Sequence, residues 1–275
     1  MLTDTHCHLD FEKFDEDREA VLQRARAAGV GRFLVPALDL GSSESVIGLA
    51  EQEPDVYAAI GFHPTDLGMF SDEALEPLKL RAQHPKVIAI GEIGLDYYWV
   101  KENVKRNDQH EALRKQLFLA GSLNMPVVVH MREEEDAWFG QASIDLMRIL
   151  SEWCMTLRSA GHPLAEKPGV LHSFNGNLET AERAIDLNFF IGVTGPVTYK
   201  SAEEKRSIIG SLPLNKLLIE TDAPFLAPVP KRGRRNEPAF VAYIADKIAE
   251  IHMTTREQVA EITAANAERL FGWGG

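Results

Sequence analysis

Short runs of apolar residues alternate along the chain with longer segments in which apolar positions recur every three or four residues. Unbroken apolar runs are typical of strands covered on both faces, as in a parallel sheet, and the periodic segments are typical of amphipathic helices. The pattern predicts strands over residues 1–10, 32–38, 56–62, 87–90, 126–129, 169–171, 189–193 and 217–219. It predicts helices over residues 15–28, 42–51, 71–83, 109–123, 144–159, 178–187, 202–211, 238–251 and 255–271.

The alternation of strands and helices determines the expected fold class. Eight strand–helix units in 275 residues favour a single (β/α)8 TIM-type barrel over a doubly wound sheet. No low-complexity segment or linker interrupts the pattern, so we expect one domain over residues 1–275. The least regular part, about residues 131–168, begins with acidic residues and is expected to form an enlarged loop and helix on the active face.

Composition restricts the classes of protein that the chain can represent. It is 45% hydrophobic and 25% charged, as in an ordinary globular protein. Cys7 and Cys154 are too few for a disulfide framework, and no signal peptide or membrane span is recognised, so we expect a cytoplasmic protein. The net charge of −12 argues against a broad surface for duplex nucleic acid. The oligomeric state is left open.

Histidines and carboxylates follow several of the predicted strands. In a barrel these strand ends meet at one rim, where barrel chemistry is found. Each such residue alone has an ordinary interpretation, as a helix cap, a solvated carboxylate or a hydrogen-bonded core histidine. Together they exceed the needs of one tetrahedral zinc ion and suit two divalent ions. The candidate ligands are His6, His8, Glu92, His130, His172 and Asp222.

This set of donors predicts a hydrolase. Two adjacent cations would lower the pKa of a water molecule between them and neutralise oxygens of a scissile phosphate or carbonyl. Glu92 is the natural bridge between the ions, and Asp222 is the candidate general base. The remaining histidines fall in predicted helices or loops and are expected at the surface: His84, His110, His162 and His252.

The sequence resembles the TatD-type metal-dependent deoxyribonucleases, a family within the amidohydrolase-like barrels. The matching stretches keep the family's order over essentially the whole chain. They are Asp4-Thr-His-Cys-His-Leu-Asp10, Gly61-Phe-His-Pro64, Gly91-Glu-Ile-Gly-Leu-Asp-Tyr97, His130, Leu171-His-Ser-Phe174, Glu220-Thr-Asp-Ala-Pro224 and Arg232-Gly-Arg-Arg-Asn-Glu-Pro238.

The resemblance implies a TIM-type barrel and a Mg²⁺-, Mn²⁺- or Zn²⁺-dependent nuclease, often a 3′→5′ exonuclease on single-stranded DNA. It assigns metal-ligand roles to the six strand-end residues and suggests His63 as a substrate or phosphate contact outside the ligand set. Two features depart from the family. Ser173 stands where Cys is usual, and the interval from His130 to His172 is long, with acidic residues 133–136 that we expect to repel a polyanion or recruit cations.

A basic cluster follows the last predicted strand on the same rim. Arginine forms bidentate contacts with phosphate, so this cluster predicts a basic lip suited to a short strand end. The basic residues are Lys231, Arg232, Arg234 and Arg235. We assign three of the arginines and the adjacent asparagine to substrate binding: Arg232, Arg234, Arg235 and Asn236. Aromatic residues after strand ends are candidates for stacking on unpaired bases: Tyr97, Tyr98, Trp99 and Phe225.

Two other functions compete with a nuclease. The first is hydrolysis of an amide, lactone or ester in a small metabolite, which the acidic surface and the acidic loop favour. Many barrels of this type carry a carbamylated lysine after strand four, whereas this chain has Glu92 there, which favours the nuclease. The second is a metal-binding or scaffold protein without activity. Nitrogen and oxygen donors accept several ions, so zinc, magnesium and manganese all stay open.

Overall fold

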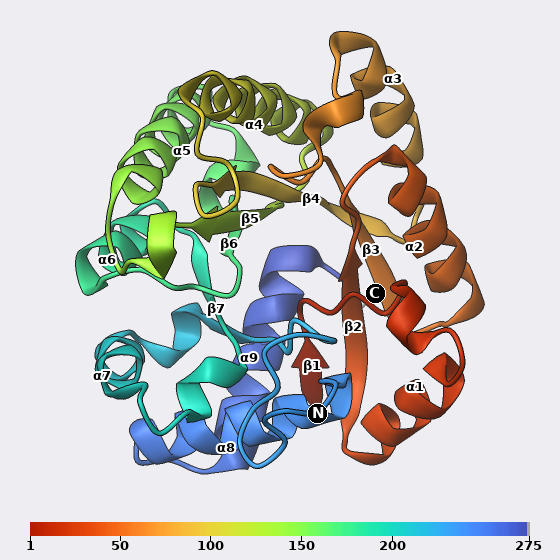
Figure 1. Ribbon diagram of the computed structural model, residues 1–275, viewed down its shortest axis with the longest axis vertical. Coiled ribbons are helices and arrows are strands. Elements are labelled where there is room, and N and C mark those ends of the chain that lie inside the picture. Colours follow the sequence, from red (N-terminus) through yellow and green to blue (C-terminus); the bar gives the residue numbers. More distant parts are fainter. Residues whose placement is uncertain (274–275) are drawn as a thin grey trace.

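Eight parallel strands form one sheet, and helices connect consecutive strands on its outside (Figure 1). The computed structural model describes residues 1–273. The strands, paired in chain order, are β1 (Leu2–Asp4), β2 (Val30–Pro36), β3 (Val56–Ile60), β4 (Val87–Asp96), β5 (Val127–Arg132), β6 (Gly169–Leu171), β7 (Phe190–Val193) and β8 (Leu217–Ile219). The helices are α1 (Arg18–Ala27), α2 (Leu40–Gln52), α3 (Asp72–Arg81), α4 (Asn103–Leu123), α5 (Gln141–Ser159), α6 (Leu178–Asp186), α7 (Glu203–Ser211), α8 (Val241–Ile251) and α9 (Arg256–Phe271).

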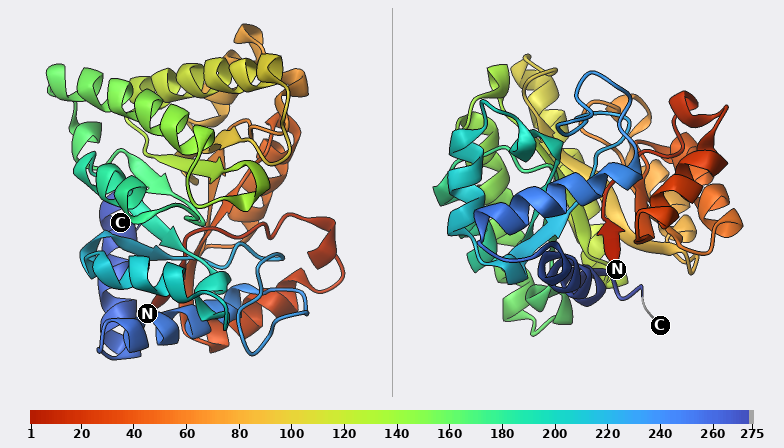
Figure 2. Two further views of the ribbon diagram at one scale, coloured as in Figure 1. Left: turned by 60° about the vertical axis from the view of Figure 1, so that its left-hand side comes forward. Right: turned by 90° about the horizontal axis from the view of Figure 1, so that it is seen from below.

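The sheet closes where the first strand meets the last. Thr5 donates its backbone N–H to the carbonyl of Ile219 at 3.2 Å, and Cys7 forms a parallel bridge with Ala223. Helices α1 to α8 surround the strands in chain order (Figures 1 and 2). The arrangement confirms the predicted (β/α)8 barrel.

A buried carboxylate reinforces this closure. Asp4, at the end of β1, accepts hydrogen bonds from the backbone N–H of Thr221 at 2.8 Å and from its hydroxyl at 2.6 Å. Burial raises the pKa of Asp4 to about 8, although these hydrogen bonds act in the opposite direction. The pair fixes the segment after β8 against the segment after β1, and both segments carry candidate ligands.

The barrel interior is apolar, and the C-terminal helix covers one end of it. Strands β2 to β8 each contribute one inward-facing residue, and the end of α9 packs against them, near the centre of the barrel in Figure 1. The interior residues are Leu34, Ala59, Ala89, Val128, Val170, Phe190 and Leu218, with Ala267, Leu270, Phe271 and Trp273 from the C-terminal segment. The apolar seal therefore lies at the amino ends of the strands, away from the candidate ligands.

The first and fourth strands differ most in length from the prediction. The first ends at Asp4 rather than residue 10, because the chain beyond it turns so that His6 and His8 face each other instead of continuing the sheet. β4 extends to Asp96, six residues beyond the predicted end, so that Glu92 lies within a strand rather than after one. Polar residues inside the extended strand concealed its length, because they interrupt the apolar run.

The segment between β5 and β6 has regular structure. It consists of the 3-10 helix η3 (Glu134–Asp136), the long helix α5 and the 3-10 helix η4 (Pro163–Glu166). Within residues 1–273, no helix is long and apolar enough to cross a membrane.

Candidate metal centre

The structure brings all six predicted ligands to the carboxyl end of the barrel. The segments that carry them belong to different strands, and only barrel closure places them together. His6 and His8 follow β1, Glu92 lies in β4, His130 lies in β5, His172 follows β6 and Asp222 follows β8. The group is largely buried: the side chain of His6 is inaccessible, and those of His130 and Asp222, the most accessible of the six, are 16% and 15% exposed.

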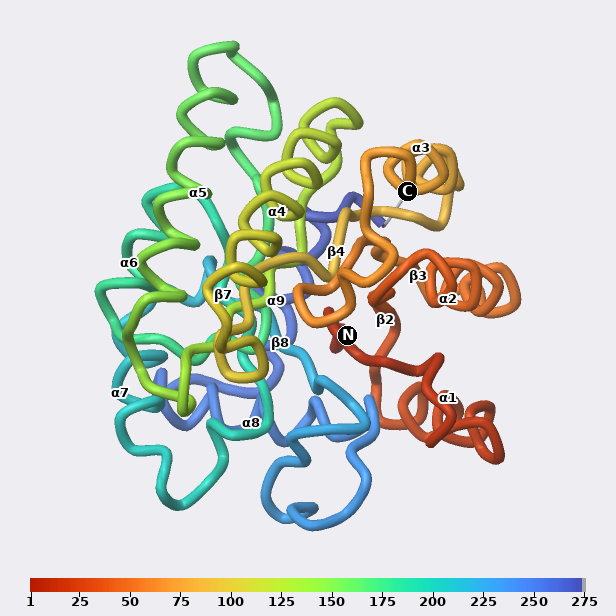
Figure 3. Tube along the Cα trace, turned by 45° about the horizontal axis from the view of Figure 1, so that its top comes forward, coloured from red at the N-terminus to blue at the C-terminus, as the bar shows by residue number. Residues whose placement is uncertain are grey.

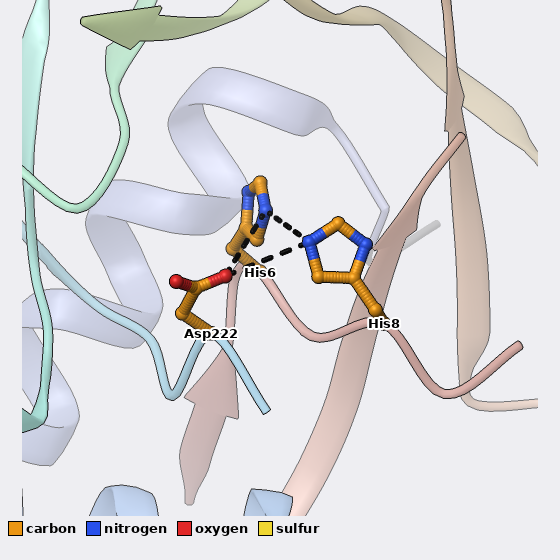
Figure 4. Close-up of side chains that lie close together, drawn as sticks. All are labelled: His6, His8 and Asp222. Carbon is orange, nitrogen blue, oxygen red and sulfur yellow. Dashed lines mark hydrogen bonds and ion pairs between the residues drawn. The ribbon is translucent and has the colours of Figure 1, made fainter. Parts of the chain in front are cut away.

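The first part of the cluster contains two imidazoles and one carboxylate whose donor atoms face a common point (Figure 4). The Nε2 atoms of His6 and His8 are 3.3 Å apart. Asp222 Oδ1 lies 3.5 Å from Nε2 of His8 and 3.8 Å from Nε2 of His6. Lone pairs that converge in this way suit a divalent cation, because a cation satisfies all three atoms at once.

Glu92 lies between this part and a second group of imidazoles. Its Oε2 is 3.3 Å from Nε2 of His6, whereas its Oε1 is 2.9 Å from Nε2 of His172 and 2.8 Å from Nδ1 of His130. The rings of His6 and His172 stack with their centroids 3.7 Å apart. The two oxygens of one carboxylate thus face two sets of donors, as a carboxylate bridging two ions must.

The charges of the cluster also favour cations. Burial acts to raise the pKa of Glu92, but the imidazoles of His172, His63 and His6 outweigh it and hold that pKa well below its usual value. Burial, with the neighbouring His172, lowers the pKa of His6. Burial acts to lower the pKa of His172, but the carboxylates of Glu92 and Glu220 raise it well above its usual value, so binding of a cation there would release a proton.

Three overlapping groups of side chains have donor atoms within 4.8 Å of one another. They are His6, His8 and Asp222; His6, Glu92 and His172; and His63, Glu92 and His130. Nitrogen and carboxylate donors at this spacing fit divalent ions such as zinc or manganese.

His63 lies closer to the ligands than the sequence indicates. Its Nε2 is 3.5 Å from Glu92 Oε1, and its Nδ1 is 2.7 Å from the hydroxyl of Thr65 and 3.6 Å from Asp66. Burial acts to lower the pKa of His63, but the carboxylates of Glu92 and Asp66 raise it to about 9. His63 therefore adjoins the centre, with 11% of its side chain exposed.

Two further carboxylates contact the predicted ligands and were not predicted. Asp96 Oδ2 lies 3.0 Å from Nε2 of His130, and Glu220 Oε1 lies 3.5 Å from Nδ1 of His172. Such partners orient a ligating imidazole. Spacing could have revealed Asp96, because residues four apart on a strand share a face with each other, and Glu92 begins that interval.

Glycines make room for these carboxylates. Gly94 has φ +151°, and a Cβ there would lie 2.0 Å from the carbonyl oxygen of His130. A Cβ at Gly192 would lie 2.4 Å from Oε1 of Glu220. Both positions require glycine, since the neighbouring strand or carboxylate occupies the space of a side chain.

The basic segment divides into two parts. Arg232 and Arg234 are exposed; Arg232 stacks over the Tyr199 ring at 4.4 Å, and within the described part of the chain neither arginine forms an ion pair. Arg235 instead forms a bidentate pair with Asp17 at 2.8 Å.

Asn236 makes its hydrogen bonds inside the protein. It is buried, and its amide donates to the carbonyls of Thr221 and Phe225 at 2.8 and 2.6 Å. These contacts hold the loop after β8 in place. Of the four substrate-binding residues expected here, the geometry leaves Arg232 and Arg234 free for a ligand and gives Arg235 and Asn236 partners inside the protein.

Three of the four residues in the acidic run at 133–136 have partners inside the protein. Buried Glu133 accepts hydrogen bonds from the first turn of α5, at the backbone N–H groups of Ala142 and Ser143. Glu134 pairs with Arg106 at 3.1 Å. In the same run, Asp136 pairs with Arg132 at 2.7 Å. These contacts offset part of the charge of the run, and its repulsion of a polyanion or recruitment of cations stays a prediction.

The other histidines lie outside the cluster but are not simple surface residues. All four are half-buried: His84, His110, His162 and His252. His110 Nε2 lies 2.5 Å from the hydroxyl of Tyr97, which is itself buried and also donates to Asp145 at 3.0 Å. Tyr97 is consequently unavailable for stacking on a base.

A (β/α)8 barrel whose carboxyl end buries several histidines around carboxylates is the arrangement of a metal-dependent hydrolase. The family model described as TatD related DNase matches residues 3–272. The chain therefore belongs to the TatD-related DNase family of metal-dependent hydrolases.

Similar proteins span the whole chain. It is 40% identical over 271 residues to the Bacillus subtilis protein named uncharacterized metal-dependent hydrolase YabD, covering 98% of this chain and 99% of the relative. It is 34% identical to the 3′-5′ ssDNA/RNA exonuclease TatD of Erwinia tasmaniensis, with 98% of each chain covered. The crystal structure of YjjV, a TatD homologue from Escherichia coli K12, superposes with a TM-score of 0.86 at 36% identity over 98% of each chain.

Proposed function

We propose that the protein hydrolyses phosphodiester bonds at the ends of single-stranded DNA, as a 3′→5′ exonuclease that uses two divalent ions. The observation that carries the proposal is the position of Glu92, whose two oxygens face two separate groups of imidazoles. A relative with 34% identity over 98% of both chains is named as an exonuclease on single-stranded DNA and RNA, which supports this substrate class.

The ligands divide between the two proposed ions. His6, His8 and Asp222 would hold one, and His130 and His172 the other, with Glu92 shared. Bound ions would supply a lowered pKa for the attacking water and positive charge beside the phosphate oxygens.

The side chains of this protein would then position and deprotonate the water. Asp222 Oδ1 faces His6 and His8, so Oδ2, which points away from them in Figure 4, is the atom that takes the proton. A new bond would form between phosphorus and the water oxygen, and the bond from phosphorus to the 3′ oxygen of the shortened strand would break. That oxygen would leave with the bonding electrons and take a proton from solvent. His63, beside Glu92, is placed to contact the phosphate.

The exposed arginines would bind the phosphates of the remaining strand. Arg232 and Arg234 lie in the loop after β8, the loop that also carries Asp222. Guanidinium groups without carboxylate partners retain their donors for phosphate oxygens. Because the net charge is −12, this small basic lip favours a short strand end over a long duplex.

Labelled single-stranded DNA tests the proposal directly. Protein of known metal content is incubated with a 3′-labelled and a 5′-labelled oligonucleotide in Mg²⁺, Mn²⁺ or Zn²⁺. Early release of the 3′ nucleotide, abolished by a chelator, is expected. Intact DNA with fully metallated protein, while a panel of esters and amides is hydrolysed, would contradict the proposal and favour the metabolite hydrolase.

A further inference from the structure

Two large aromatic side chains stand exposed beside the metal centre. Trp99 is 67% exposed and Phe225 is 42% exposed. Both follow strands at the carboxyl end of the barrel, where the predicted ligands lie. Exposed aromatic rings beside a polar site are characteristic of ligand-binding surfaces.

Phe225 is anchored next to the His8 side of the cluster. Its backbone N–H donates to the carbonyl of Asp222 at 2.8 Å, and its ring centroid is 6.3 Å from that of His8. Phe11 packs against it edge-on at 5.9 Å, and the ammonium of Lys13 lies 5.0 Å from its centroid. The ring has these three neighbours, and 42% of the residue stays accessible.

Trp99 is anchored next to the His130 side. Its backbone N–H donates to Asp96 Oδ1 at 2.8 Å, and the other oxygen of that carboxylate lies 3.0 Å from His130 Nε2. The indole packs edge-on against Tyr98 at 4.9 Å, and the guanidinium of Arg132 lies 3.8 Å from the Tyr98 centroid. One carboxylate therefore links the position of Trp99 to that of a predicted ligand.

Trp99 and Phe225 follow two strands that lie opposite each other in the barrel. β4 and β8 are four strands apart in a closed sheet of eight, so the loops after them start from opposite strands of the barrel; Figure 3 traces the first loop in olive-yellow and the second in light blue. The donor cluster lies between them. A nucleic acid crossing the mouth would pass one ring on entering and the other on leaving.

We infer that Phe225 and Trp99 are stacking sites for unpaired nucleobases on either side of the metal centre, an inference that rests on the proposed nuclease function. Every base presents a π-face, so two such sites bind a single strand without regard to its sequence. Bases in a duplex stack on one another and are not free to occupy these rings. Discrimination between single-stranded and double-stranded substrates then follows from stacking rather than from base-edge hydrogen bonds.

Binding can be measured without turnover. Tryptophan fluorescence of the protein in EDTA is titrated with the tetranucleotide dT4 and with an abasic tetranucleotide that has the same phosphates. Trp138 and Trp153 are half-buried and Trp273 is buried, so Trp99 is the accessible reporter. Quenching by dT4 alone, lost in Trp99→Phe, is expected; equal quenching by the abasic chain would overturn the inference at Trp99.

Variants test both rings against a matched control. Trp99→Ala and Phe225→Ala should each weaken binding of fluorescein-labelled dT4, measured by anisotropy so that no tryptophan is needed as reporter, and raise KM for a single-stranded oligonucleotide about tenfold, with kcat nearly unchanged. With the abasic oligonucleotide as ligand, the same two substitutions should change binding by less than twofold. Phe118→Ala, which removes a ring 79% exposed on the outer helix α4, should change neither value.

The outcomes separate this inference from the function it rests on. If the wild type cleaves DNA and both Trp99→Ala and Phe225→Ala match it in KM and in dT4 binding, the stacking sites are refuted and the nuclease stands. If the wild type cleaves no DNA, the proposed function fails. The fluorescence titration then still decides whether the rings bind bases.

Discussion

The two ends of the barrel bury very different side chains. At the amino ends of the strands, the last turn of α9 closes an apolar interior with Leu270 and Phe271. At the carboxyl ends, ionisable side chains are buried against one another, with Glu92 3% exposed and His6 fully buried. Burying apolar surface stabilises the fold, whereas burying a carboxylate costs free energy unless a partner compensates.

The contrast assigns different tasks to the two ends. The apolar end stabilises the barrel, and the polar end holds groups that only a bound cation satisfies fully. Substitutions at the two ends should therefore separate activity from stability.

The largest effect is expected at the polar end. Glu92→Gln removes the carboxylate that faces both groups of imidazoles, so hydrolysis should fall at least about 10³-fold, and the bound metal should fall with it. Initial rates on labelled DNA and elemental analysis measure the two effects. Far-ultraviolet circular dichroism should be unchanged.

Glu134→Gln is the matched control for that substitution. Its carboxylate pairs with Arg106 outside the cluster, and activity should stay within twofold of the wild type. A Glu92→Gln protein that retains full metal content and turnover would remove Glu92 from the mechanism.

The opposite result is expected at the apolar end. Leu270→Ala removes a fully buried side chain from the contact between α9 and the strands, which should lower the free energy of unfolding by about 3 kcal/mol. At 25 °C kcat should stay within twofold, because the cavity lies at the far end of the barrel. Urea denaturation measures the loss. Leu80→Ala, at an exposed position, should cost under about 0.5 kcal/mol.

A smaller effect is expected one contact away from the ligands. Glu220 is fully buried beside His172, so Glu220→Gln should orient that imidazole less well and lower metal affinity by about 10- to 100-fold. Competition with a chromogenic chelator measures the affinity. Excess metal should restore most of the activity, whereas persistent loss at saturating metal would assign Glu220 a direct role in the reaction.

The smallest effect concerns the ion pair that ties the basic segment to α1. Hydrogen bonds from Arg235 lower the pKa of Asp17 from 3.8 to about 2. The pair therefore stabilises the fold above pH 4, and that contribution is lost as the pH falls toward 2. Because Asp17 is 36% exposed, Asp17→Asn should cost only about 0.5 kcal/mol at pH 7.

Urea denaturation midpoints measured at pH 6 and pH 3 test the predicted loss of this stabilisation as the pH falls. The difference between the wild type and Asp17→Asn should shrink at pH 3, and 1 M salt should reduce it at pH 6. A difference that grows as the pH falls would contradict the assignment of the Asp17 pKa to this pair.

The same contrast explains how much the sequence predicted. Apolar runs and helical periodicity gave the barrel and most elements, and the boundaries of β6 (Gly169–Leu171) and β8 (Leu217–Ile219) agree with the prediction. The meeting of the six predicted ligands followed from barrel topology, since parallel strands place their carboxyl ends at one rim. The pattern of apolar and polar residues predicts structure best where burial alone decides the residue type.

The remaining features depend on contacts that no local pattern encodes. Arg232 and Arg235 look equivalent in the sequence, yet only Arg235 lies within reach of Asp17. The sequence gives Glu133 the character of a surface charge, whereas in the structure it accepts hydrogen bonds from the first turn of α5. In both cases the partner is distant in sequence or lies across a turn, so tertiary structure decides whether the charge is available to a ligand.

Barrel closure has a consequence for when the enzyme can act. The backbone N–H of Asp222 donates to the carbonyl of His6 at 2.8 Å, so the first and last ligands in the chain meet only when β8 docks beside β1. A ribosome-bound chain that has emerged only as far as β7 carries five of the six predicted ligands and lacks Asp222, the proposed proton acceptor. The candidate metal centre is therefore complete only when the final strand is in place.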